Sequence, residues 1–150
     1  MSTYKRILSA VLVFGFIGLV AACDNPVEDE LDDDHAEVEG VALMVGGEEV
    51  VRVLEGEVTG ELEIAADGGS VEIDVEFLDH DGDRIHAEDL DEDFSLGWEI
   101  ADESVVTASQ TGDWSFSLTP GAAGVTDLSV QLMHGGHADF TTPDIHVHVE

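Results

Sequence analysis

Apolar and polar side chains alternate strictly between Ser70 and Phe77, and this alternation limits the fold more than any other feature of the sequence. Val71, Ile73, Val75 and Phe77 fall on one face of an extended chain, and the other face carries mainly carboxylates. A period of two is typical of a half-buried antiparallel strand. Turn residues separate further predicted strands at residues 41–45, 48–54, 56–65, 95–100, 104–109, 113–119, 125–133 and 144–149. Because no window has a helical period, we predict an all-β sandwich of two antiparallel sheets.

The first 22 residues have the pattern of a bacterial signal peptide. Lys5 and Arg6 precede about a dozen apolar residues, which are too few to cross roughly 30 Å of hydrocarbon. The alternative, a transmembrane helix that ends in a buried cysteine, needs a longer apolar segment. Residues 20–23 (VAAC) resemble a lipobox, and this resemblance implies that the sulfur of Cys23 carries diacylglycerol. We therefore expect a palmitate-bearing lipoprotein of the cell envelope, anchored to a membrane through its N-terminus.

An acidic segment, residues 23–39, follows the leader and has too few large apolar side chains to form a core. We expect it to be a disordered tether. Loss of Lys5 and Arg6 with the leader takes the formal charge from −31 to −33, which disfavours nucleic acid as a partner. The acidic run resembles surface-export signals of Bacteroidetes lipoproteins, whereas Asp24 next to the cysteine resembles an enterobacterial signal for inner-membrane retention. The periplasmic face and the cell surface therefore both remain open.

Residues 40–150 are long enough for one independent domain. Within them, residues 98–108 (WEIADESVVTA) and 118–130 (LTPGAAGVTDLSV) resemble two strand motifs of bacterial Ig-like domains of the Big type. Residues 79–85 (DHDGDRI) resemble the turn between two early strands of the same families. The resemblance implies an Ig-like sandwich that serves as a spacer, an adhesive module or a small binding module, without catalytic activity. It covers about half of the domain and says nothing about the histidine-rich C-terminus.

Four histidines near the C-terminus are candidate metal ligands: His134, His137, His146 and His148. A Gly-Gly turn between His134 and His137 would make these two residues directly opposed across a hairpin. In residues 144–150 (DIHVHVE) the apolar side chains should face the core, which places His146 and His148 together on the outer face. Either pair could supply two ligands to Zn²⁺ or Cu²⁺. Alternatively, the histidines are neutral polar residues of a chain that contains almost no lysine.

Asp79, Asp81 and Asp83 suggest Ca²⁺, but their spacing does not match an EF-hand. The sixth position from Asp79 is Arg84 rather than glycine, and the twelfth is Leu90 rather than a carboxylate. Asp81 and Gly82 are typical of a hairpin turn, which we favour, while the loop would take up Ca²⁺ loosely.

The sequence does not indicate an enzyme. It contains no Gly-x-Ser-x-Gly motif, and its one cysteine is the expected lipidation site. Trp98 and Trp114 are expected to be packing residues of the core and the sheet face rather than a platform for a ligand. Two functional classes remain: a non-catalytic Ig-like interaction module, and an envelope lipoprotein that uses its C-terminal histidines to store, deliver or sense Zn²⁺ or Cu²⁺.

Overall fold

A computed structural model describes residues 37–90 and 92–150 of the chain. The expected signal peptide, the lipidation site Cys23 and residues 24–36 of the expected tether lie outside the described residues. The described part consists of β-strands and one short 3₁₀ helix, η1 (Ala87–Asp89). No helix in this part is long and apolar enough to cross a membrane. The prediction of an all-β fold is confirmed.

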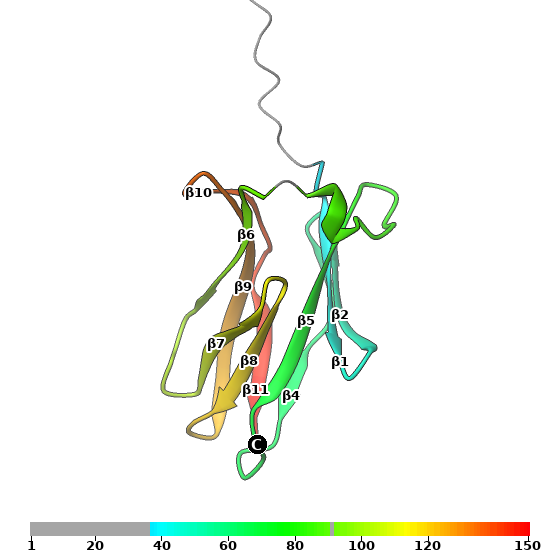
Figure 1. Ribbon diagram of the computed structural model, residues 1–150. Helices are drawn as coiled ribbons and strands as arrows, with labels where there is room; N and C mark the ends of the chain where they lie inside the picture. The colour runs from blue at the N-terminus through cyan, green and yellow to red at the C-terminus, as the bar shows by residue number, and fades with distance from the viewer. Residues whose placement is uncertain (1–36, 91) are drawn as a thin grey trace, which may run out of the picture. The chain divides into compact units, whose positions relative to one another are not determined.

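The strands form the two layers of a sandwich (Figure 1). The first sheet has the strand order β3-β2-β1-β5-β8-β7, and every neighbouring pair in it is antiparallel. The hairpin between its first two strands turns at Gly46 and Gly47, which both have a positive φ, as predicted. The strands of this sheet are β1 (Gly40–Val45), β2 (Glu48–Leu54), β3 (Glu57–Gly60), β5 (Val71–Leu78), β7 (Val106–Gly112) and β8 (Ser115–Pro120).

The long strand β9 organises the second sheet. It pairs with β6 along one side, while β10 and β11 pair one after the other along its other side. β4 extends the sheet beyond β11. The strands of this sheet are β4 (Leu62–Ile64), β6 (Phe94–Ile100), β9 (Gly124–His134), β10 (His137–Thr141) and β11 (Ile145–Val149).

The strand order is that of an immunoglobulin-like sandwich. β5, β8 and β7 occupy the places of strands B, E and D, and β6, β9 and β11 occupy those of C, F and G. The hairpin β1-β2 and the strand β3 widen the first sheet on the side away from β7. The predicted Ig-like β-sandwich is therefore present, but the second sheet is mixed rather than purely antiparallel, because β4 pairs with β11 in parallel.

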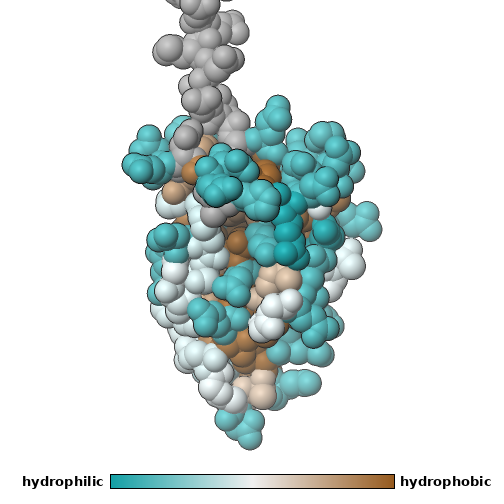
Figure 2. Space-filling view, turned by 45° about the vertical axis from the view of Figure 1, so that its right-hand side comes forward, coloured by the Kyte–Doolittle hydropathy of each residue, from teal (hydrophilic) through white to brown (hydrophobic). Residues whose placement is uncertain are grey.

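The core lies between the two sheets and follows the alternation of the sequence. Ile73, Val75 and Phe77 are buried, as the pattern in β5 predicted. Ile145 and Val147 are buried in β11, which leaves the intervening His146 on the outer face. Figure 2 shows that hydrophilic residues cover most of one face of the molecule, and that hydrophobic residues appear in a band along its middle.

The predicted single strand at residues 56–65 is wrong. The chain makes two short strands here, β3 in the first sheet and β4 in the second, and it crosses between the sheets at Gly60 and Glu61. Gly60 has φ +89°, and a Cβ on this residue would lie 2.2 Å from the carbonyl oxygen of Val50. Only glycine fits such a backbone, so the crossing is encoded by one residue inside an otherwise regular pattern.

Candidate metal centre

The hairpin between β9 and β10 brings two of the four candidate histidines together. His134 lies directly opposite His137 in the register, and Gly135 and Gly136 form the turn with φ values of 56° and 96°. Two consecutive positive φ values are the requirement of the tight turn that suits the twist of a hairpin. The prediction that these histidines form the closing pair is confirmed, and their ring centroids lie 5.9 Å apart.

His134 lies at the end of the core rather than on the outer face. Along β9 the inward residues Leu128, Val130 and Leu132 are fully buried, and His134 continues this alternation. Its ring stacks on that of Phe94, the opposite residue of β6, with centroids 4.4 Å apart. The side chain is 26% exposed, and its Nδ1 atom is buried. Stacking and burial therefore fix the ring before any ligand arrives.

Asp139 is the third member of this cluster, and the sequence analysis missed it. Ala138 lies opposite Met133 and Phe140 lies opposite Leu132, so Asp139 is the additional residue of a β-bulge. Bulges redirect side chains. The Asp139 carboxylate lies with Oδ2 3.3 Å from Nδ1 of His134 and with Oδ1 2.7 Å from Nε2 of His137. Its side chain is only 3% exposed, although His137 is 62% exposed.

This cluster, which we call the HHD cluster (His134, His137 and Asp139), has the geometry of a metal site. Its three ligand atoms all lie within 4.8 Å of one another, and it is the only such group of three or more within residues 37–90 and 92–150. In a tetrahedral Zn²⁺ site with bonds of about 2.0 Å, neighbouring ligand atoms are about 3.3 Å apart. The cluster is somewhat wider than this, with its ligand atoms within 4.8 Å of one another, and the two imidazoles face different oxygens of the Asp139 carboxylate.

His146 and His148 do not join the HHD cluster. They lie on β11, opposite Asp127 and Val125 of β9, whereas His137 lies opposite His134 at the far end of the same strand. His134 lies seven positions after Asp127 on β9, which corresponds to roughly 23 Å. His146 Nδ1 lies 2.8 Å from Asp127 Oδ1, and His148 Nε2 lies 3.1 Å from Glu61 Oε2. Each of these histidines thus has its own carboxylate partner.

The β10 and β11 strands explain this separation. Together they form the return strand of one long hairpin, interrupted at residues 142–144. At the interruption, the backbone N–H of Val130 donates to the hydroxyl of the buried Thr142, and the N–H of Thr142 donates to the carbonyl of Val130. These bonds keep the return strand beside β9 across the interruption. The pair His134 and His137 therefore lies at one end of the hairpin, and the pair His146 and His148 lies at the other.

The Asp79 carboxylate has a structural role. Its Oδ1 accepts the backbone N–H groups of Asp81 and Asp83, both at 2.9 Å, in the turn with Gly82 at positive φ. Arg52 donates to the carbonyl of Gly82 and so holds this loop against the first sheet. The three carboxylates are not among the described groups whose ligand atoms converge. The turn is as predicted, and Ca²⁺ binding by Asp79, Asp81 and Asp83 stays a prediction.

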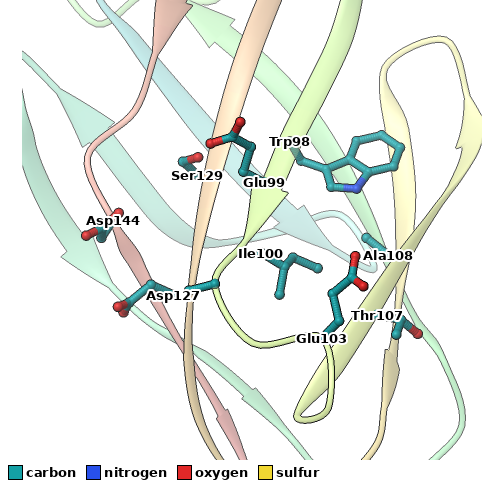
Figure 3. A pocket seen from close by; sticks show the side chains of 10 residues that line it. Trp98, Glu99, Ile100, Glu103, Thr107, Ala108, Asp127, Ser129 and Asp144 are labelled. Carbon is teal, nitrogen blue, oxygen red and sulfur yellow. The ribbon is translucent and has the colours of Figure 1, made fainter.

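A second feature is an open groove of about 550 Å³ between β6, β7 and β9 (Figure 3). Trp98, Ile100 and Ala108 are among the apolar residues that line it. The ring of Trp98 also stacks on that of Phe116 in the core. Trp114 meets Phe77 edge to face, and both tryptophans are partly buried and pack against the core. The groove has an acidic rim: Glu99, Glu103, Asp127 and Asp144.

The loop at the end of this groove is held by Asp102. The hydroxyl and the backbone N–H of Ser104 donate to Asp102 Oδ1 at 2.6 and 2.9 Å. These two bonds, the hydroxyl first, hold the pKa of the Asp102 carboxyl below its ordinary value. The carboxylate therefore stays charged across the neutral range and caps the turn that carries Glu103.

Comparisons with known proteins add no further assignment. No protein-family model matches the sequence, and a search of the curated proteins gave no significant match.

Proposed function

We propose that this protein is a lipid-anchored protein of the bacterial cell envelope whose Ig-like sandwich binds Zn²⁺ or Cu²⁺ at the HHD cluster. One observation carries the proposal: His134, His137 and Asp139 place three ligand atoms within 4.8 Å of one another at the end of one hairpin. Imidazole nitrogen and carboxylate oxygen are suitable ligands for both ions. The domain would hold the ion for storage, delivery or sensing, without a catalytic role.

The burial of Asp139 supports this proposal. A carboxylate withdrawn from water is costly unless it is paired, hydrogen-bonded or bound to a metal. Asp139 has both imidazoles of the cluster as neighbours, at 2.7 Å from His137 and 3.3 Å from His134. A divalent ion between Asp139 and the two imidazoles would balance the buried charge. The strongly acidic chain, with 35 Asp and Glu residues against four Lys and Arg, also attracts cations.

The expected anchor would keep this site close to a membrane. Thirteen residues separate Cys23 from Glu37, the first described residue, and an extended chain of this length reaches at most roughly 50 Å. A metal-binding domain on such a tether would exchange its ion with other envelope proteins.

Metal titration of the mature protein in detergent micelles tests the function. We expect wild-type protein to bind one Zn²⁺ per chain, and His137→Ala to weaken binding at least about 100-fold. Loss of a direct ligand should cost at least as much as loss of a group that only orients a ligand, which costs 10- to 100-fold. His137 suits this test because its side chain is 62% exposed and carries little packing. Isothermal titration calorimetry with Zn²⁺ and Cu²⁺ measures the change.

The double variant His146→Ala/His148→Ala is the matched control, since it removes the two histidines at the other end of the same hairpin. It should bind Zn²⁺ as wild type does. The proposal fails if this variant loses affinity while His137→Ala keeps it, or if wild-type protein binds both ions more weakly than about 1 mM.

The proposed location of the protein in the cell envelope depends on Cys23. We expect wild-type protein to incorporate radiolabelled palmitate and to partition into the membrane fraction, and Cys23→Ser to do neither, because the serine hydroxyl is not a substrate for thioether formation. Acyl chains contribute about 0.8 kcal/mol per buried CH₂, so their loss should release the protein completely. The proposed location is contradicted if the wild-type protein takes up no label. It is also contradicted if the serine variant is processed and bound to the membrane in the same way as the wild type.

A second candidate function, the non-catalytic interaction module, is favoured by the groove in Figure 3. Its apolar lining residues and four carboxylates suit a partner segment that presents basic side chains around an apolar one. Failure of metal binding in the titration would leave this function as the leading one.

A further inference from the structure

We infer that the groove between β6, β7 and β9 binds an extended, basic segment of a partner protein, which joins the second sheet as a strand beside β6. The inference rests on the second candidate function, the interaction module, and is independent of the metal site. It starts from the position of β6, which is the outermost strand of its sheet (Figure 1). Within residues 37–90 and 92–150, β6 pairs with β9 alone, so its other edge is open to a new strand.

β6 differs from the other outermost strands of the two sheets in length and regularity. β3, β4 and β10 have four, three and five residues, and both β7 and β10 contain a register shift. β6 has seven residues, its register with β9 is unbroken, and it contains neither proline nor lysine. Short strands, bulges, proline and lysine are the usual features that keep an edge from pairing. In the described part of the chain, β6 is therefore the edge best suited to accept a strand.

The groove follows this edge. Residues 98–101 all line it, and consecutive side chains of a strand point to opposite faces, so the groove runs along the edge rather than over one face. The N–H of Ala101 donates to the carbonyl of Asp127 on β9. Because alternate residues of an antiparallel strand bond to the same neighbour, Trp98 and Ile100 direct their backbone N–H and C=O groups away from β9. These groups are available to an added strand.

The charge around the groove favours a basic segment. A second copy of this chain would bring a further formal charge of −31 and would be repelled. In a strand added beside β6, alternate side chains would lie on the outer face near Glu99, where lysine or arginine suits the site. The side chains between them would lie on the side of Ile100 and Ala108, where apolar residues suit it. The residues that line the groove include no lysine or arginine and four carboxylates: Glu99, Glu103, Asp127 and Asp144.

Peptide titration of the mature protein in micelles of a non-ionic detergent tests the inference. The probe is a fluorescent peptide of about eight residues in which lysine and valine alternate. A second peptide has the same side chains but methylated backbone amides, so it keeps the charge and cannot donate the hydrogen bonds of a strand. We expect saturable binding of the first peptide and at least about tenfold weaker binding of the second. In hydrogen exchange followed by NMR, the first peptide should protect the amides of Trp98 and Ile100.

Two charge variants locate the binding site. Glu99→Lys/Glu103→Lys places lysines beside the open edge and should weaken binding of the first peptide at least about tenfold. Glu57→Lys/Glu63→Lys is the matched control, because it makes the same change in charge at two exposed residues outside the groove. This control should bind the first peptide within about threefold of wild type.

The outcomes separate strand addition from the interaction module. If both peptides bind equally and only Glu99→Lys/Glu103→Lys weakens them, the groove attracts basic partners by charge alone, and only strand addition fails. If a bound peptide leaves the exchange of Trp98 and Ile100 unchanged, strand addition beside β6 is wrong. If neither peptide binds, the basic partner and the interaction module fail together. If the protein instead self-associates in sedimentation with these two amides protected, the occupant is a second copy and the inference is overturned.

Discussion

Replacing Phe116 with alanine is expected to lower the free energy of unfolding by about 3–5 kcal/mol. Phe116 is the largest fully buried side chain, and it lies in the first sheet opposite Ile73 of β5. Its ring stacks on that of Trp98 from the second sheet, with centroids 5.2 Å apart, so it joins the two layers. Alanine would leave a cavity and would remove this stack, and the sandwich has little room to close around the gap. Chemical denaturation of the metal-free protein measures the effect.

Val125→Ala is the control for this prediction. Val125 lies on β9 of the same sandwich, but its side chain is 56% exposed. Its loss should change the free energy of unfolding by no more than about 0.5 kcal/mol. If the two variants were equally stable, the core would not lie between the sheets as described.

The features that could be predicted from the sequence are those encoded by short-range periodicity. The alternation in β5 fixed which side chains are buried, because a strand with one buried face must show a period of two. The same argument placed Ile145 and Val147 in the core and His146 outside it. The Gly-Gly pairs at both hairpins were equally informative, since consecutive positive φ values are costly for any other residue.

The features that escaped prediction depend on contacts between distant segments. The crossing at Gly60 depends on its approach to the carbonyl of Val50, which a local pattern does not contain. The parallel pairing of β4 with β11 joins residues far apart in the chain. Periodicity shows on which face of a strand a residue lies. It does not show to which of the two sheets a short strand belongs.

The candidate site shows the same division. The pairing of His134 with His137 followed from the turn between them, whereas Asp139 was missed because it occupies a bulge. A signal was present, since Asp139 is two residues after His137 and would share its face in a regular strand. The sequence placed His146 and His148 on one outer face, but it could not show that they lie at the other end of β9 from His134. Position along a hairpin depends on register, which here includes the interruption at residues 142–144.

Zn²⁺ is expected to stabilise the wild-type domain strongly, because the HHD cluster joins the two strands of the β9-β10 hairpin at the end of the core. At a free Zn²⁺ concentration 100 times the dissociation constant, an ion that binds only the folded state adds about 2.7 kcal/mol to the free energy of unfolding. For a domain of this size, the corresponding rise in Tm is roughly 10 °C. Differential scanning calorimetry of mature protein freed of metal by a chelator, with and without Zn²⁺, measures this shift.

Asp139→Asn separates metal binding from packing. Asparagine keeps the shape of the side chain and removes the charge that is costly to bury. Without metal, the variant should therefore melt no lower than wild type, because an amide costs less to bury than a carboxylate in a chain this acidic. With Zn²⁺, it should lose most of the rise in Tm, since a neutral amide oxygen is a poor substitute for a carboxylate ligand. An equal rise in both proteins would mean that the ion binds elsewhere on the acidic surface, and a large drop in the metal-free variant would mean that Asp139 serves the fold rather than a metal.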